Sequence, residues 1–275
     1  MRISKSSNFV INLFLCVGAV LSFFPIYLAI INSFKTQGEM FSSFLALPTK
    51  LHFENYSQAF QQIHLLNSTL NSVTVSVIGI GGIVFCAALA GYKLSRTSGK
   101  LSAMIFSLFI ASMLVPFHSI MIPLTRMAKG LHVSGSTYGL AIIYIGLGVN
   151  MAVFLYHGFV KSIPRELDEA ARIDGCGEFQ TFFRIIFPLL LPISVTVAIL
   201  DFLWIWNDFL LPLLMLTDST KYTLILSTNT LFGEYNKEWS LILAALVLTA
   251  IPVILIYAFF QKFIMQGIAD GAIKG

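Results

Sequence analysis

One short polar segment, Glu169-Ala170-Ala171 followed by Asp174 and Gly175, lies between two long apolar stretches of the chain. Ten residues after Gly175 the sequence continues with Ile185-Ile186-Phe187-Pro188. Small residues at helical spacing form a face that another protein surface could approach closely. The segment is therefore a candidate contact site for a partner protein.

Two short helices are expected to carry this segment. Pro164 suits the first position of a helix that Gly175 can end, and the acidic residues Glu166, Asp168 and Glu169 complement the positive end of the helix dipole. Helical spacing places four residues on one face, namely Leu167, Ala170, Ala171 and Asp174. A second helix is expected after Gly177, with an aromatic face of Phe179, Phe182, Phe183 and Ile186. An amphipathic hairpin that only rests on the membrane surface is an alternative interpretation of the same pattern.

Two carboxylates lie within apolar runs, Asp201 and Asp208, and an acidic residue inside a membrane segment is costly enough to suggest a function. Pro212 has no N–H for the carbonyl of Asp208, so the helix is expected to open near Trp206, Asn207 and Asp208. These three residues either face a transport pathway or a paired subunit, or they cap the interrupted backbone. Asp201 is expected to pack between helices. Asn150 in another apolar run either lines a pathway or pairs within a helix contact.

The sequence offers no catalytic or metal-binding set. It lacks a G-x-x-x-x-G-K-[ST] phosphate loop, and its three cysteines and five histidines show no ligand spacing. We therefore expect no cofactor, no metal site and no catalytic residue in this chain. A secondary transporter or ion channel is a rival interpretation, and a membrane enzyme using Asp201, Asp208 and His157 is another.

Composition identifies the chain as an all-α polytopic membrane protein. Of its 275 residues, 57% are hydrophobic and only 11% are charged, against about 25% charged in soluble domains. Six continuous apolar runs approach the ~20 residues that a helix needs to cross a bilayer. The expected spans are 9–31, 70–92, 102–124, 137–159, 188–215 and 241–261. The first span is too long for a signal-peptide core and ends without a small-residue cleavage site, so we expect it to be retained.

Basic residues predict the orientation of these spans. Eleven Lys and Arg residues flank one set of span ends and six flank the other. The positive-inside rule places the richer side, with both termini and the residue-170 segment, in the cytoplasm. The net charge of +4 then reflects topology, and no nucleic-acid partner is expected.

The segment Glu169-Ala170-Ala171, Gly175, Ile185-x-Phe187-Pro188 resembles the EAA motif of binding-protein-dependent ABC importer permeases, with Phe187 in place of the usual leucine. The resemblance extends along almost the whole chain and is closest to the MalG-like permeases of carbohydrate importers. Other similar segments include Ala90-Gly91-Tyr92-Lys93-Leu94-Ser95-Arg96, Trp206-Asn207-Asp208-Phe209 and the tail Gly267-Ile268-Ala269-Asp270-Gly271-Ala272-Ile273-Lys274-Gly275.

This resemblance implies a single transmembrane domain over residues 1–275 in the plasma or inner membrane, with residues 160–187 as a cytoplasmic coupling loop. The residues implied in coupling to the ATPase are Glu169, Ala170, Ala171, Asp174, Gly175, Ile185 and Pro188. The tail, with Gly271, Lys274 and Gly275, resembles tails that reach between ATPase subunits; a frayed terminus is the alternative.

The implied partners are a second permease subunit, usually a paralogue, two ABC ATPase subunits that bind ATP and Mg²⁺, and an extracytoplasmic solute-binding protein. Residues 33–69, 125–136 and 216–240 are candidate docking surfaces for the last of these. The sequence does not name the solute: an oligosaccharide, a monosaccharide derivative and glycerol phosphate all stay open.

Overall fold

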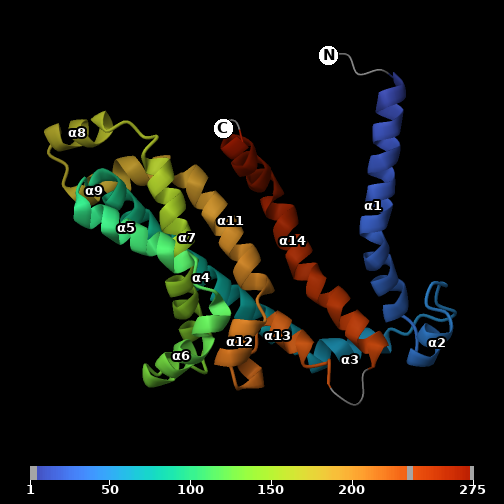
Figure 1. The fold of residues 1–275 in the computed structure, drawn as a ribbon. Helices are drawn as coiled ribbons and strands as arrows, with labels where there is room; N and C mark the ends of the chain where they lie inside the picture. Colours follow the sequence, from blue (N-terminus) through green and yellow to red (C-terminus); the bar gives the residue numbers. More distant parts are fainter. Residues whose placement is uncertain (1–4, 234–237, 273–275) are drawn as a thin grey trace. The chain divides into compact units, whose positions relative to one another are not determined.

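A computed structural model describes residues 5–233 and 238–272, with side-chain surroundings for 11–233, 238–258 and 261. Every regular element in this part is a helix, in agreement with the all-α prediction (Figure 1). The chain divides into two compact units, Met1–Leu66 with Ser227–Leu255 and Asn67–Leu226 with Ile256–Gly275. Each unit is described by itself, and a single transmembrane domain over residues 1–275 stays a prediction.

Four of the expected spans correspond to single long, apolar helices. These spans are Ile11–Ser33 within α1 (Lys5–Ser33), α4 (Leu65–Arg96), α7 (Thr137–Val160) and Trp239–Ala258 within α14 (Trp239–Ala272). Their bounds agree with the expected ranges 9–31, 70–92, 137–159 and 241–261 to within a few residues. Length and apolarity alone therefore located these helices in the sequence.

The third expected span, 102–124, is not one straight helix. The chain forms α5 (Lys100–Met113) and α6 (Phe117–Gly130), which meet at an angle of 105°. Pro116 caps α6 with an extended backbone, φ −61° and ψ 135°. Proline has no N–H to donate and disfavours a helical conformation of the residue before it. The helix therefore ends ahead of Val115-Pro116, although the sequence stays apolar through these residues.

The fifth expected span, 188–215, is also interrupted. The helical stretch Glu178–Leu189 meets α11 (Leu191–Asn207) at 74°, and α12 (Leu210–Met215) follows after Asp208. Pro192 lies at the start of α11, where its missing N–H interrupts no helical hydrogen bond. The described part of the chain thus contains four helices long and apolar enough to cross a membrane, or up to six such spans if each bent pair is one span.

In the first unit, the segment after α1 is organised around a buried lysine. Lys35 is fully buried, and its ammonium donates hydrogen bonds to Asn32 Oδ1 at 2.9 Å and to the carbonyl of Ser43 at 2.7 Å. The amide of Asn55 donates to the carbonyls of Ser33 and Lys35 and so ties in α3 (Glu54–Gln62). The short helix α2 (Gln37–Ser42) lies between these contacts.

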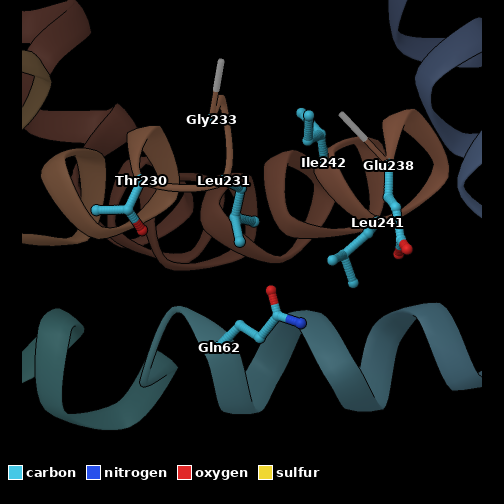
Figure 2. Close-up of a pocket in the computed structure, with 7 residues that line it drawn as sticks. All are labelled: Gln62, Thr230, Leu231, Gly233, Glu238, Leu241 and Ile242. Atoms are coloured by element: carbon cyan, nitrogen blue, oxygen red, sulfur yellow. The ribbon is translucent and has the colours of Figure 1, made fainter. Parts of the chain in front are cut away.

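The same unit contains a cavity of about 310 Å³ beside α3 and the start of α14. Figure 2 shows Gln62 of α3 pointing towards the segment that carries Leu231 and Leu241, with Glu238 at the same site. The helix α13 (Leu224–Asn229) precedes this segment. Five of the seven lining residues belong to the predicted outer segments 33–69 and 216–240, and Leu241 and Ile242 belong to the expected span 241–261.

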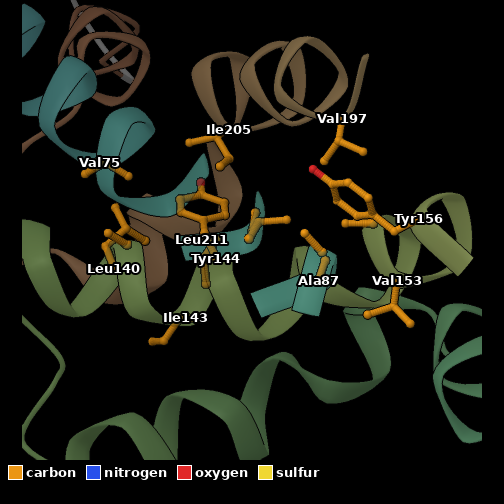
Figure 3. Packing of buried hydrophobic residues seen from close by; sticks show 14 of the residues in the cluster. Val75, Ala87, Leu140, Ile143, Tyr144, Val153, Tyr156, Val197, Ile205 and Leu211 are labelled. Atoms are coloured by element: carbon orange, nitrogen blue, oxygen red, sulfur yellow. The ribbon is translucent and has the colours of Figure 1, made fainter. Parts of the chain in front are cut away.

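The core of the second unit is centred on α7. Figure 3 shows Tyr144 pointing towards Ile205 of α11 and Tyr156 pointing towards Val197, and all four side chains are buried. The hydroxyl of Tyr156 donates to Ser194 Oγ at 2.7 Å, which satisfies a polar group within this apolar contact.

The helices α4 and α7 approach each other closely in this core. A Cβ atom added to Gly91 would lie 2.6 Å from Tyr156 Cβ and 3.0 Å from the backbone nitrogen of His157. Only glycine fits at this contact, so α4 and α7 pack backbone against backbone at Gly91.

Candidate functional site: the segment between α7 and α11

The polar segment after α7 forms the helix α8 (Glu166–Ile173), seen at the end of α7 in Figure 1. Three acidic side chains in its first turn complement the helix dipole. Asp174 caps its C-terminal end, and Gly175 follows with φ +81°. This left-handed conformation suits glycine and strains other residues, so the turn depends on Gly175.

Asp168 and Ala171 are the buried residues of α8. Ala171 is only 2% exposed and packs into its own chain, so it does not share a free face with Leu167, Ala170 and Asp174. Ile173 is 86% exposed instead. An isoleucine so open to water is a feature of interaction surfaces when it adjoins other exposed apolar groups. The sequence analysis missed Ile173, although its apolar type next to Arg172 and Asp174 was a usable signal.

Asp168 joins α8 to the end of α4. Its Oδ2 atom lies 2.9 Å from Arg96 Nη2, and its Oδ1 atom accepts a hydrogen bond from the hydroxyl of Tyr92. Arg96 Nη2 also donates to the carbonyl of Ile163 at 3.0 Å. The side chains of Arg96 and Asp168 are 13% and 11% exposed, so this is a largely buried ion pair. Sequence reasoning treated Asp168 only as a dipole-complementing residue and did not find this pair, whose members are 72 positions apart.

A second ion pair joins the same two regions at the surface. Lys93 Nζ lies 2.8 Å from Glu178 Oε2, with side chains 61% and 67% exposed. The hydrogen bond from Lys93 holds the pKa of Glu178 below its usual range. Exposed pairs contribute little to stability because water and salt screen them.

The predicted aromatic face is divided between the core and the surface. The chain after Gly177 forms α9 (Glu178–Thr181), the π-helical turn η1 (Phe182–Ile186) and α10 (Phe187–Leu189). Phe182 and Ile186 are buried, whereas Phe179 is 73% exposed and Phe183 44%.

The remaining motif residues of this stretch also differ in exposure. Ile185 is half-buried against the core and Pro188 is exposed. Glu169, Ala170, Asp174 and Gly175 are exposed on the α8 side. The motif residues other than Ala171 therefore leave an accessible surface, to which Ile173 and Phe179 add apolar area.

The residues at the end of α11 are held by capping contacts. Asp208 adopts an extended backbone, and its Oδ1 atom accepts a hydrogen bond from the N–H of Leu210 at 2.9 Å. Its Oδ2 atom accepts from the hydroxyl of Tyr144 at 2.7 Å, and the amide of Asn207 donates to the carbonyl of Leu203. The helix is interrupted at Asp208, as expected. The contacts of Asp208 and Asn207 agree with the interpretation in which these side chains cap the interrupted backbone.

The other candidate pathway residues are not brought together in one site. Trp206 is 2% exposed, and its indole N–H has no hydrogen-bond partner among the described residues. Asn207 is exposed, and Asn150 is half-buried on α7. Asp201 is buried at 8% exposure on α11, as expected for a residue packed between helices.

The predicted tail falls partly outside the described residues. Gly271 lies in the last turn of α14, while Lys274 and Gly275 are not among the described residues. Within the described part of the chain, no group of three or more His, Cys, Asp or Glu side chains is arranged to hold a metal ion.

Comparison with known proteins places this arrangement in a family. Residues 82–270 match the profile of the binding-protein-dependent transport system inner membrane component. The probable starch degradation products transport system permease protein AmyC of Thermoanaerobacterium thermosulfurigenes is 39% identical over 94% of this chain and 95% of its own length. The melibiose/raffinose/stachyose import permease protein MelC of Bacillus subtilis is 34% identical over the full length of both chains.

A solved structure shares the fold. A chain in the crystal structure of a bacterial ABC transporter involved in the import of the acidic polysaccharide alginate superposes with a TM-score of 0.82, at 21% identity, over 95% of this chain and 99% of that one. The full-length sequence likeness, the matched profile and the apolar helices agree. The chain belongs to the family of inner membrane permease components of binding-protein-dependent transport systems.

Proposed function

We propose that this chain forms half of the translocation pathway of an ABC importer for a sugar or a related solute, crossing the membrane six times with both termini in the cytoplasm. The solute class is supported by the relatives, which are named for starch degradation products and for melibiose, raffinose and stachyose. The six spans follow if each bent helix pair crosses the membrane once. The orientation follows from the excess of Lys and Arg on the α8 side.

In this proposal the chain is not an enzyme and works with four other subunits. A second permease, usually a paralogue, completes the pathway, and two ABC ATPase subunits bind ATP and Mg²⁺. A solute-binding protein docks on the outer segments 33–69, 125–136 and 216–240, which include five of the seven residues lining the cavity in Figure 2. The tail, with Gly271, Lys274 and Gly275, contacts the ATPase subunits.

The observation that carries the proposal is the accessible surface of α8 within a matched family motif. Glu169 and Ala170 are exposed there, and Ile173 beside them is 86% exposed. A carboxylate beside exposed apolar groups suits a cleft that has an arginine or lysine and an apolar floor. We propose that this surface seats in a cleft of an ATPase subunit and moves when the ATPase subunits close on ATP.

Two substitutions test this role. Glu169→Ala removes the proposed charge contact, and Gly175→Val strains a turn that has φ +81°. Both variants should insert normally, but uptake in proteoliposomes should fall about tenfold or more per ATP hydrolysed, since losing one side of a buried charge contact is costly. Glu166→Ala, on the same helix and also exposed, is the matched control and should keep wild-type uptake.

Gentle purification from native membranes provides the companion measurement. A second permease and an ATPase with vanadate-sensitive activity should co-purify with the wild-type chain, and Glu169→Ala should weaken retention of the ATPase. Wild-type uptake by both Glu169→Ala and Gly175→Val would contradict the role of α8. A wild-type chain that elutes without any ATPase would contradict the importer proposal and favour a channel or secondary transporter.

A further inference from the structure

The helix α4 contacts different functional segments at its two ends. At its C-terminal end, Arg96 and Tyr92 hold Asp168 of α8 by the ion pair and hydrogen bond described above. At its N-terminal end, it holds the loop that follows α12. All of these residues lie in the second compact unit.

The contacts at the N-terminal end of α4 are made to backbone groups. The amide of Asn71 donates to the carbonyls of Thr220 at 2.9 Å and Tyr222 at 3.0 Å, and the amide of Asn67 donates to the same Thr220 carbonyl. Ser72 Oγ accepts a hydrogen bond from the N–H of Leu224 at 2.8 Å. Three side chains from neighbouring turns of α4 thus fix the path of the loop over residues 218–224, which contains the turn η2 (Ser219–Lys221).

Between these ends α4 is one uninterrupted helix of 32 residues. From Asn67 to Arg96 it extends roughly 40 Å at 1.5 Å per residue. A continuous hydrogen-bonded helix transmits an axial displacement with little internal change, whereas the broken helices α5 and α6 would absorb it at their bend. The element that connects the two ends is therefore a single uninterrupted helix.

Burial distinguishes the Asp168 attachment from the neighbouring surface pair. Removing one partner of a buried ion pair leaves an uncompensated charge in the interior, so the Asp168–Arg96 contact resists separation. The Lys93–Glu178 pair joins nearby residues but is more than half exposed and separates at little cost. Asp168 also faces α4 while the adjacent Glu169 is exposed.

We propose that Asp168, Arg96 and Tyr92 attach α8 to α4, and that α4 carries a displacement of α8 to the loop over residues 218–224. The three are positioning residues, because they act on the loop through α4. This inference rests on the proposed function, in which α8 moves with the ATPase subunits and the loop belongs to an outer docking segment. It adds a physical route from α8 to the loop. Asp168 acts inside the permease through its contact with α4, and Glu169 acts towards the ATPase subunit.

The test uses the complete complex in nanodiscs, with Ser219→Cys carrying a fluorescent maleimide in a background without the native cysteines. Ser219 is exposed within the held loop. Trapping with ATP and vanadate should change the fluorescence of the wild-type complex. Asp168→Asn and Arg96→Gln should reduce both this change and the uptake per ATP hydrolysed by about tenfold, a usual size for coupling between two sites. The ATPase subunits should remain bound, because Glu169 and Ile173 are untouched.

Two further variants separate positioning from folding. Tyr92→Phe removes only the hydroxyl that donates to Asp168 and keeps the ring against Phe182, so it should reduce the fluorescence change partially in a normally assembled complex. Glu178→Gln breaks the exposed pair between the same two regions and should leave the change at wild-type size.

A wild-type fluorescence change and wild-type uptake per ATP in Asp168→Asn and Tyr92→Phe would overturn the inference. Loss of the ATPase subunits from the Tyr92→Phe complex would also overturn the inference. The contact between Tyr92 and Asp168 would then be needed for binding of the ATPase subunits. Either result leaves the proposed function standing. The importer proposal fails only if the wild-type chain has no ATPase partner, and the role of α8 fails only if Glu169→Ala and Gly175→Val both keep wild-type uptake.

Discussion

At the scale of single residues, neighbouring side chains of one type lie in different environments. Asp168 and Glu169 are adjacent carboxylates, yet one is buried against Arg96 and the other is exposed. The motif pattern found Glu169, whereas the partner of Asp168 is unpredictable from local spacing because Arg96 lies in a different helix. For Asp208 the residue pattern allowed two interpretations, and only the contacts with Leu210 and Tyr144 show that its side chain caps a helix break.

A conservative substitution measures the contribution of the contact at this break. Tyr144→Phe removes the hydroxyl that donates to Asp208 and leaves a carboxylate oxygen without that partner. We expect a loss of about 1–3 kcal/mol in the free energy of unfolding, the usual cost of an unsatisfied polar group. Thermal unfolding in detergent measures the change. Tyr138→Phe, on the same helix but 64% exposed, is the control and should differ little from wild type.

At the scale of elements, hydropathy located the apolar runs but not the breaks within them. The run 102–124 is apolar throughout, and only the backbone restrictions at Val115-Pro116 separate α5 from α6 at 105°. Four other runs form helices close to the expected bounds. Prolines within two of them, Pro25 in α1 and Pro252 in α14, do not end the helix. Proline alone therefore does not predict a break, and packing decides which prolines end a helix.

The close approach of α4 and α7 is testable by adding side-chain volume. Gly91→Val places atoms where a Cβ would already lie 2.6 Å from Tyr156 Cβ, so the helices must separate. We expect destabilisation of about 1–3 kcal/mol, as for other overpacked contacts. Unfolding in detergent measures it, and Gly81→Ala on the same helix, where a Cβ has nothing within 4 Å, should be tolerated. Equal stability of Gly91→Val and wild type would contradict the packing described here.

At the scale of the whole molecule, the sequence predicted the family, which the comparisons confirm, and an all-α class, with which the described helices agree. The sequence likeness extends over nearly the whole chain, which made this possible. The division into two compact units was not predicted, since it depends on which distant segments pack together. Orientation across the membrane rests on charge counts and stays a prediction.

Cysteine labelling in intact cells tests this orientation. In a background without native cysteines, a membrane-impermeant maleimide added outside should react with Ser219→Cys and not with Thr97→Cys. Thr97 lies between α4 and α5, Ser219 lies in the turn η2, and both are exposed. Opening the cells should allow Thr97→Cys to react, which controls for its intrinsic reactivity. Labelling of Thr97→Cys from outside would reverse the topology and remove α8 from the cytoplasm.

The exposed Ile173 bears on how the importer stays together through its cycle. An isoleucine left in water on α8, with Phe179 nearby in sequence, favours being covered by about 25 cal/mol for each Å² of apolar surface removed from water. This term depends on neither nucleotide nor salt, unlike the contact of Glu169. In the proposed complex the ATPase subunits would therefore remain attached after ATP is hydrolysed and its products are released. Each cycle would then start from a fully assembled complex.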